Sequence, residues 1–243
     1  MREIVLDTET TGFDPTDGDR IVEIGALELF NHVPTGKTYH QYINPKRYMP
    51  KEAFGVHGIG PDLLQPPRKA EPGEVTLRDK PVFAEIAKDF VEFIGDSKLV
   101  IHNAAFDMKF LNAELGWLNM TKLPWAQAID TLAIARKKFP GSPASLDALC
   151  RRFNVDNASR TLHGALLDSE ILAEVYLELI GGRQPDFVLS GAGTDNTQNS
   201  GEAWRAQQRP DKLPPRLTNE EAAAHSAFVE AMGDGALWKK LSD

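Results

Sequence analysis

An apolar run that ends in acidic side chains, close to the N-terminus, most constrains how this chain folds. Residues 4–6 (Ile-Val-Leu) predict a buried strand, and residues 7–12 (Asp-Thr-Glu-Thr-Thr-Gly) follow directly. Strand side chains alternate between faces, so Asp7 and Glu9 point the same way. Two carboxylates aimed at one spot repel each other, and a bound cation would remove that cost. The run predicts a metal site with oxygen ligands, the alternative being an acidic turn after an edge strand.

Length and composition limit the class of protein. The chain has 243 residues, 42% of them apolar, which predicts one sizeable domain with an appendage. The single cysteine, Cys150, excludes a disulfide framework and is interpreted as a small buried hydrophobe in a helix. No apolar signal region follows Met1, and no stretch approaches the roughly 18 apolar residues of a membrane span. We therefore expect a soluble, cytoplasmic protein.

The charge balance limits how the chain could bind nucleic acid. Its net charge is −8. Sequence-independent binding depends on Lys and Arg side chains that neutralise phosphates, so an acidic chain is a poor binder of this kind. Any contact with nucleic acid is expected to be local, through metal ions and a small cleft, or to depend on a partner protein.

Strands come first along the chain, and helices then alternate with strands. After the first strand, we expect strands at residues 20–29, 38–43 and 98–101, and a short strand or turn at 128–131. The first three strands of the chain are expected to form an antiparallel meander. Helices are expected at 50–54, at 81–94, around 110–115, before 139–141, at 145–152 and from about 163 to 179. Residues 55–59 and 65–80 have the composition of loops. This order predicts an α/β fold with a mixed sheet flanked by helices.

The composition changes after residue 182. Residues 190–216 are rich in Gly, Ser, Asn, Gln, Thr and Pro, which predicts a flexible linker. Residues 219–238 are again rich in residues that favour helices, and they end in Ala-Leu-Trp. This pattern indicates a short helix followed by either a docking peptide or a frayed terminus. The expected organisation is a compact domain at 1–183, the linker, and a short C-terminal segment at 217–243.

Three later residues are expected to meet the end of the first strand. Asp107 follows the 98–101 strand, and Asp168 lies in the first turns of the last helix. Five residues turn about 140° on an ideal helix, so His163 is placed in the loop before that helix, beside Asp168. Taken singly, Asp107 could be a carboxylate at a helix N-terminus and His163 a surface histidine. Asp168 could pair with Arg160. Together they indicate a metal-assisted hydrolase.

Four stretches resemble the motifs of the DEDDh exonucleases. They are residues 5–12 (VLDTETTG), 54–59 (FGVHGI), 100–107 (VIHNAAFD) and 161–168 (TLHGALLD). Their flanking residues are most similar to the family of proofreading (epsilon) subunits of bacterial DNA polymerase III. The resemblance covers about residues 3–182, and the layout of the tail is similar as well. The 65–80 segment is longer than the family requires at this place.

This resemblance implies an RNase H-like α/β fold and a 3′–5′ exonuclease that removes mispaired 3′-terminal nucleotides from DNA during replication. It implies two divalent cations, Mg²⁺ or Mn²⁺, with ligands from Asp7, Glu9, Asp107 and Asp168. His163 would be the general base. The pocket for the terminal nucleotide would be lined by Thr10, Thr11, Val56, His57, Asn103 and Phe106.

Two of the neighbouring residues keep an alternative. His57 could instead be a loop histidine with satisfied hydrogen bonds. Asp130 is expected either to support the site from behind or to cap the helix that begins at Thr131.

The resemblance also implies partners. The substrate would be a single-stranded or frayed 3′ end of DNA, and the C-terminal segment 217–243 would dock on the catalytic (alpha) subunit of the polymerase. Residues Gln184–Leu189 (Gln-Pro-Asp-Phe-Val-Leu) resemble peptides that bind the sliding clamp. Two alternatives remain open: a DEDDh exoribonuclease of the RNase T or oligoribonuclease type, and a non-catalytic scaffold that stabilises the polymerase.

Overall fold

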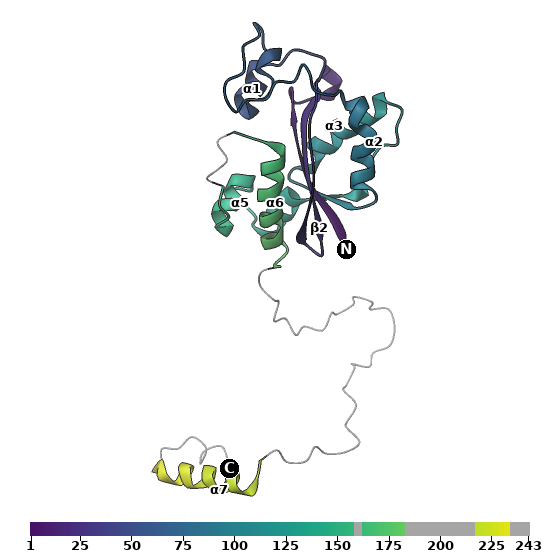
Figure 1. Cartoon of the computed structure of the whole chain (residues 1–243). Coiled ribbons are helices and arrows are strands. Elements are labelled where there is room, and N and C mark those ends of the chain that lie inside the picture. Colours follow the sequence, from purple (N-terminus) through teal and green to yellow (C-terminus); the bar gives the residue numbers. More distant parts are fainter. Residues whose placement is uncertain (158–161, 183–216, 234–243) are drawn as a thin grey trace. The chain divides into compact units, whose positions relative to one another are not determined.

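The computed structural model describes residues 1–157, 162–182 and 217–233 (Figure 1). The chain divides into two units, Met1–Leu189 and Ser190–Asp243. The linker expected at 190–216, the clamp-binding peptide expected at 184–189 and the aromatic tip of the tail all lie outside the described residues. Their boundaries stay predictions.

A five-stranded mixed sheet with the order β3-β2-β1-β4-β5 forms the centre of the first unit. The strands are β1 (Arg2–Thr10), β2 (Ile21–Phe30), β3 (Val33–Tyr42), β4 (Lys98–Ile101) and β5 (Ala128–Asp130). The first three pair antiparallel, as the expected meander requires, whereas β4 pairs parallel with both β1 and β5. The predicted α/β fold with a mixed sheet is confirmed.

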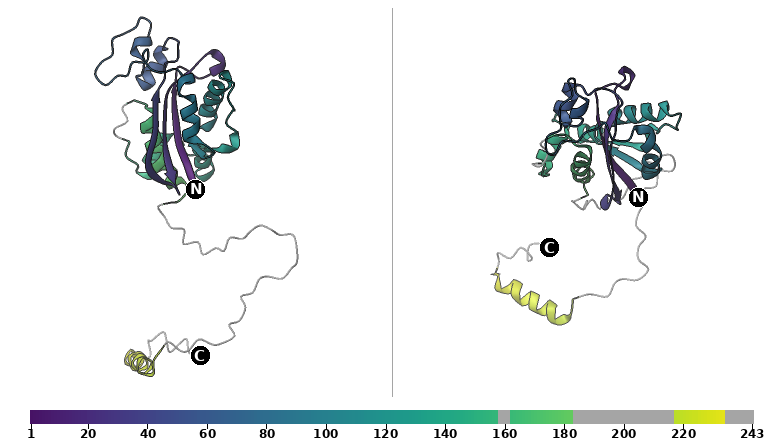
Figure 2. Two further views of the ribbon diagram at one scale, coloured as in Figure 1. Left: turned by 45° about the vertical axis from the view of Figure 1, so that its right-hand side comes forward. Right: turned by 45° about the horizontal axis from the view of Figure 1, so that its top comes forward.

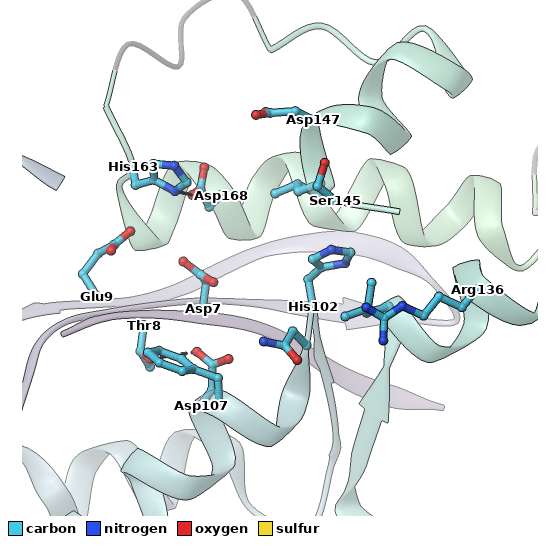
Figure 3. Close-up of a pocket in the computed structure, with 14 residues that line it drawn as sticks. Asp7, Thr8, Glu9, His102, Asp107, Arg136, Ser145, Asp147, His163 and Asp168 are labelled. Atoms are coloured by element: carbon cyan, nitrogen blue, oxygen red, sulfur yellow. Dashed lines mark hydrogen bonds and ion pairs between the residues drawn. The ribbon is translucent and has the colours of Figure 1, made fainter. Parts of the chain in front are cut away.

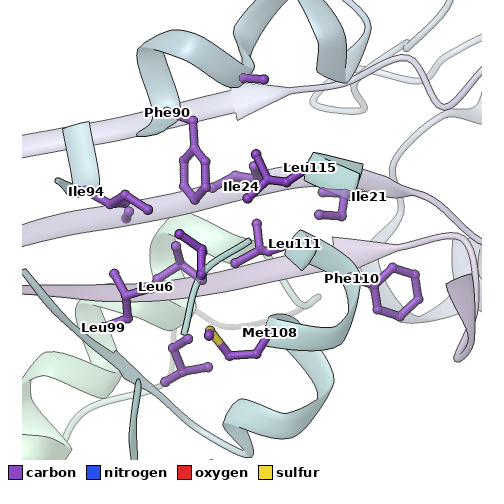
Figure 4. Packing of buried hydrophobic residues seen from close by; sticks show 14 of the residues in the cluster. Leu6, Ile21, Ile24, Phe90, Ile94, Leu99, Met108, Phe110, Leu111 and Leu115 are labelled. Atoms are coloured by element: carbon purple, nitrogen blue, oxygen red, sulfur yellow. The ribbon is translucent and has the colours of Figure 1, made fainter. Parts of the chain in front are cut away.

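Helices cover both faces of this sheet, as the two views in Figure 2 show. On one face lie α2 (Phe83–Ile94) and α3 (Ala104–Trp117), and the other carries α4 (Thr131–Lys138), α5 (Leu146–Phe153) and α6 (Ala165–Leu179). The strand alternation divides the core between them, because Ile4 and Leu6 pack with α2 and α3 whereas Val5 packs with α5 and α6. Figure 4 shows the first cluster, with Phe90 and Leu111 packed over Leu6.

A third hydrophobic cluster lies around the short helix α1 (Lys51–His57). Its buried members are Val22, Met49, Ile59, Leu63, Leu64 and Leu77. The helix is longer than expected, so the loop prediction for residues 55–59 is wrong at its first three positions. Gly55 continues the helix, and the helix ends only at Gly58, which has a left-handed φ of 68°. The 65–80 segment has no helix or strand, as expected, but it buries Leu77 completely.

Short 3₁₀ turns connect several of these elements: η1 (Pro15–Asp17), η2 (Pro61–Leu63) and η3 (Trp125–Gln127). In the second unit, α7 (Asn219–Ala231) is the expected helix. Its N-terminus has a capping box, in which Thr218 and Glu221 satisfy each other's backbone N–H groups. Within the described residues 217–233, α7 buries none of its side chains. None of the helices in the described part of the chain is long and apolar enough to span a bilayer.

Candidate active site

The acidic residues of β1 lie where this strand runs on beyond its parallel neighbour. The pairing of β1 with β4 ends at Val5 and Val100, so Asp7 and Glu9 lie beyond the last residue of β1 that pairs with β4. The crevice at the carboxyl ends of parallel strands is the usual binding place in an α/β sheet. Both side chains point to the α6 side, as Figure 3 shows for Asp7 and Glu9. The expectation that they share one face is confirmed.

Gly25 of β2 allows helix α6 to reach this crevice. In the β1–β2 ladder Gly25 lies directly across from Asp7. A Cβ atom at Gly25 would lie only 2.1 Å from the backbone nitrogen of Leu166, so the first turn of α6 rests on the bare backbone of β2. The hydroxyl of Ser169 donates to the Gly25 carbonyl at 2.9 Å. This close approach brings Asp168 next to Asp7.

Glu23 fixes the N-terminus of α6 to the sheet. Gly164 occupies the N-cap position and has no side chain to offer, so the first N–H groups of the helix need another acceptor. The N–H of Ala165 donates to Oε2 of Glu23 at 3.1 Å, and Nε2 of His40 lies 2.7 Å from Oε1. A carboxylate at this position also interacts favourably with the helix dipole. Glu23 therefore acts as the cap that Gly164 lacks.

His163 lies in the loop directly before α6, as expected. Its Nδ1 is 3.3 Å from Oδ2 of Asp168, and its backbone N–H donates to the carbonyl of Val56 at 3.2 Å. One ligand atom each of Glu9, His163 and Asp168 lies within 4.8 Å of the others. Figure 3 shows the imidazole beside Asp168 and above Glu9. The last motif thus provides a half-exposed imidazole next to a buried carboxylate.

Asp107 completes the acidic group from the first turn of α3. The hydroxyl of Thr8 donates to its Oδ1 at 2.7 Å. Burial raises the pKa of Asp107 to about 7, although this hydrogen bond opposes the shift. Burial also raises the pKa of Asp7 well above its ordinary value, and the charges of Asp107, Glu9 and Asp168 raise it further. The carboxylates therefore oppose one another's ionisation unless positive charge lies between them.

Two adjoining hollows meet at Glu9, one of these carboxylates. The first has a cavity volume of about 540 Å³ and contains all five residues predicted for metal binding and proton transfer. The second has about 550 Å³ and is lined by Thr10, Thr11, Val56 and His57. Thr8, Glu9 and Phe106 border both. Of the residues expected to hold the terminal nucleotide, only Asn103 lies in the first hollow and outside the second.

His57 is a buried residue of a helix and not a loop histidine. Its Nδ1 accepts the N–H of Ile59 at 3.0 Å. Burial lowers the pKa of His57 to about 4, so the ring is neutral at physiological pH and carries its proton on Nε2. His57 thus accepts one hydrogen bond through Nδ1 and lines the second hollow, whereas its buried Nε2 has no hydrogen-bond partner among the described residues. The alternative of a loop histidine with satisfied hydrogen bonds is therefore wrong.

Asp130 caps the helix that begins at Thr131, as one of its two alternatives expected. Its carboxylate caps α4 by accepting the N–H groups of Leu132 at 2.9 Å and Ala133 at 3.3 Å. The same Oδ1 accepts the N–H of Asn103 at 3.2 Å. Asn103 adopts a left-handed φ of 65° at the start of α3, which carries Asp107. Asp130 therefore stabilises the backbone turn behind the acidic group.

Several pocket residues were not predicted from the sequence. Phe13 lines the second hollow and is 85% exposed, and its position directly after the first motif was the available signal. His102, Arg136 and Ser145 line the first hollow (Figure 3). Arg136 and Ser145 come from α4 and from the N-cap of α5. The spacing of Arg136 and Ser145 in the sequence did not indicate that these residues line the crevice.

The relatives of the chain decide its family. A sequence profile of the exonuclease family matches residues 4–176. DNA polymerase III subunit epsilon of Rickettsia conorii is 50% identical over 239 residues, which cover 94% of this chain and 95% of the relative. DNA polymerase III subunit epsilon of Escherichia coli is 43% identical over 250 residues, covering 98% of this chain and 97% of that one. The chain belongs to the epsilon-subunit family of DNA polymerase III.

The predicted class of enzyme, a proofreading 3′–5′ exonuclease of the epsilon family, is therefore confirmed. Solved structures show the same fold. The nuclease domain of 3′hExo, a DEDDh family member bound to rAMP, has a TM-score of 0.58 at 18% identity, over 74% of this chain and 92% of that one. E. coli Exonuclease I in complex with a dA16 oligonucleotide has a TM-score of 0.59 at 18% identity, over 76% and 41%. The roles of individual residues in this epsilon-family chain stay predictions.

Proposed function

We propose that this epsilon-family exonuclease excises mispaired 3′-terminal nucleotides at the crevice described above. Two divalent cations would be held by Asp7, Glu9, Asp107 and Asp168. The observation that carries the proposal is the convergence of Glu9, His163 and Asp168 within 4.8 Å, beside the raised pKa values of Asp7 and Asp107. Function thus rests on five side chains from β1, α3 and the start of α6.

The donor set fits hard divalent cations. All four proposed ligands offer carboxylate oxygens, which Mg²⁺ and Mn²⁺ prefer over softer ligands. Their mutual repulsion raises the pKa of Asp7, and cations would relieve it. When bound, such a pair of cations stabilises the charge that develops on the attacking and leaving oxygens of a phosphodiester. Asp7, whose pKa is raised by the charges of Asp107, Glu9 and Asp168, would be one of the residues that hold the cations.

His163 is the proposed general base. Its Nδ1 faces Asp168, which orients the ring and leaves Nε2 to accept the proton of the attacking water. A half-exposed position allows the imidazole to exchange this proton with solvent. Cleavage of the terminal phosphodiester would release a nucleoside 5′-monophosphate.

The second hollow would hold the terminal nucleoside. Its walls combine the backbone edge at Thr10 and Thr11 with the apolar faces of Val56 and Phe106. Apolar and aromatic surfaces stack on any base, so they hold a base without reading its identity. A proofreading enzyme requires this tolerance. Phe13, at the exposed border of the same hollow, adds a further aromatic surface.

The first hollow would then receive the strand on the 5′ side of the scissile bond. The two hollows share Thr8, Glu9 and Phe106, so a strand whose last nucleoside fills the second would leave through the first. Arg136 lies on this exit path, and within the described part of the chain it forms no ion pair. A guanidinium there supplies local positive charge for a backbone phosphate. This placement supports a nucleic-acid substrate for a chain whose net charge is negative.

The epsilon relatives imply that the chain works within a polymerase complex on DNA. We propose that segment 217–243 docks on the polymerase catalytic subunit and that Gln184–Leu189 binds the sliding clamp. Support for the first comes from α7, which exposes Phe228, is followed by the exposed Met232, and buries none of its side chains within the described residues 217–233. Exposed apolar side chains of this kind are common in docking segments.

Excision assays on the purified chain test the proposed site. With Mg²⁺, the chain should shorten a 3′-mismatched DNA primer faster than a short RNA of equal length, and Asp7→Asn should abolish both reactions. Glu92→Gln, an exposed acid in α2, serves as the matched control and should keep full activity. Retained activity in Asp7→Asn would show that the ligands are wrongly assigned. Faster digestion of the RNA would favour an exoribonuclease.

A further inference from the structure

The 65–80 segment, which is longer than the resemblance to the family requires, covers one side of helix α1. Val75 of this segment packs into the third hydrophobic cluster together with Ala53 and Phe54 of α1. The guanidinium of Arg68 lies 5.3 Å from the centre of the Phe54 ring. The segment therefore contacts α1 through both an apolar and a cationic side chain.

The C-terminal part of the segment is firmly attached to the domain. Leu77 is fully buried in the third cluster. The backbone N–H groups of Leu77 and Arg78 donate to the carboxylate of Asp62 at 3.0 and 2.9 Å. The side chain of Asn44 donates to the Arg78 carbonyl at 2.7 Å. Irregular backbone with this many hydrogen bonds and a fully buried leucine is a fixed support of the domain.

Arg68 is held over Phe54 from two directions. Its guanidinium donates to both oxygens of Glu74, at 2.5 and 3.0 Å, in a bidentate pair. Its backbone N–H donates to the carbonyl of Pro61 at 3.0 Å. Glu74 in turn accepts the N–H of Glu71 at 2.7 Å. Arg68 thus presents a flat, oriented cation to the aromatic ring.

Helix α1 needs such support. It has only seven residues, includes Gly55, and begins at Pro50 without a side-chain cap among the described residues. A helix this short with an internal glycine is unstable by itself. Yet α1 carries Val56, whose carbonyl accepts the backbone N–H of His163 at 3.2 Å, and His57 on the wall of the second hollow. Movement of α1 would disturb both.

We propose that Arg68 is a positioning residue for exonuclease action. Together with Glu74 it clamps Phe54, and through α1 it holds the backbone of His163 and the pocket for the terminal nucleoside in place. The inference rests on the proposed function of the crevice, and it gives the 65–80 segment a role in the reaction.

The test compares two arginines of the same segment in the full chain. Arg68→Met removes the ion pair and the cation over Phe54, whereas Arg78→Met removes an exposed arginine whose side chain pairs with Asp62. We expect Arg68→Met to lower kcat for mismatch excision roughly three- to tenfold and to raise KM, because one cation–π and ion-pair contact is worth about this factor. A merely structural loss would reduce the active fraction and leave KM unchanged. Arg68→Lys keeps the positive charge but not the planar guanidinium, so its kcat and KM should lie between those of the wild type and those of Arg68→Met.

Hydrogen–deuterium exchange without added metal gives a readout that is independent of activity. Arg68→Met should speed exchange of the amides of α1 and of His163, and Arg78→Met should not. Equal effects of both variants on exchange or KM would overturn the role of Arg68, as would unchanged exchange in α1. An inactive wild-type chain would instead refute the proposed function of the crevice, so the two failures are distinguishable.

Discussion

Asp7 of β1 lies directly across the antiparallel ladder from Gly25 of β2, and α6 rests on that glycine. A methyl group at Gly25 would overlap the backbone of α6 at Leu166, at 2.1 Å, and neither backbone can yield cheaply. Gly25→Ala should therefore displace α6, and Asp168 with it. We expect excision to fall roughly 100-fold, as for other small misplacements of catalytic groups. The free energy of unfolding should fall by about 1–3 kcal/mol.

Gly55→Ala is the matched control for this substitution. Gly55 lies within α1, and a Cβ atom there would meet no atom of the described residues within 4 Å. Alanine is the better helix former, so stability should stay equal or rise by up to about 1 kcal/mol. Thermal unfolding and mismatch excision of both variants provide the comparison. Similar losses in the two would show that the close approach of α6 is not what makes Gly25 necessary.

Metal-free protein should lose stability as the pH rises. The pKa values of Asp7 and Asp107 are raised in the folded chain, mainly by burial. An acid with a raised folded-state pKa favours folding below its ordinary pKa, and this contribution disappears as the pH rises through the folded value, about 7 for Asp107. The Tm in chelator should therefore fall between pH 5 and pH 8, and Mn²⁺ should restore it at pH 8 but have little effect at pH 5.

Asp7→Asn separates the repulsion among these carboxylates from any other dependence of stability on pH. Removing one charge from the crowded group should raise the Tm of the metal-free chain at pH 8 above that of the wild type, while abolishing excision. The same substitution should reduce the rise in Tm that Mn²⁺ causes. A metal-free Asp7→Asn chain that is less stable than the wild type at pH 8 would contradict the repulsion among these carboxylates.

Glu28 should make the opposite contribution at acid pH. Hydrogen bonds from Arg2 and Thr35 lower the pKa of this buried carboxyl to about 2. Its stabilising effect is complete above the ordinary value near 4.5 and is lost as the pH falls from there toward 2. Glu28→Gln should lower the free energy of unfolding at pH 7 by about 1 kcal/mol, since solvent at Arg2 and Lys37 screens the pair. The difference from wild type should vanish near pH 2 in urea titrations.

Arg136 should matter only for substrates that have a strand upstream of the scissile bond. Arg136→Gln is expected to raise KM for a DNA oligonucleotide roughly three- to tenfold, the usual effect of one charged contact. Hydrolysis of a nitrophenyl ester of thymidine 5′-monophosphate, which lacks that strand, should be unchanged. Lys88→Gln, an exposed cation of α2, controls for net charge. Equal effects on both substrates would place Arg136 at the reacting phosphate instead of on the exit path.

The local patterns predicted much of the fold and the members of the acidic group. The apolar run before Asp7 and the position of His163 before α6 follow from strand and helix periodicity, which depend only on neighbouring residues. The sequence did not indicate the length of α1, because a glycine at position 55 reads as a loop signal when its tertiary support is unknown.

At the site as well, the features that could not be predicted from the sequence depend on residues that become neighbours only in the folded chain. Glu23 caps α6 from a strand that lies 142 positions earlier, and Arg136 reaches the crevice from α4, the helix that follows β5. Neither contact produces a periodic pattern in the sequence from which it could be predicted. The 65–80 segment was expected to be an exposed loop because it is polar and rich in proline, yet it buries Leu77 completely and donates backbone N–H groups to Asp62.

Removing residues 217–243 should separate excision from assembly. Residues 217–243 belong to a unit of their own, and α7 contributes no buried side chain within the described residues 217–233. All proposed catalytic and pocket residues lie in the other unit. The truncated chain should therefore excise mismatches at the wild-type rate but fail to co-purify with the polymerase catalytic subunit. A chain lacking only residues 239–243 keeps Trp238 and should still co-purify. Unchanged co-purification of the longer truncation would remove the docking role, and lost excision would mean that the tail supports the crevice itself.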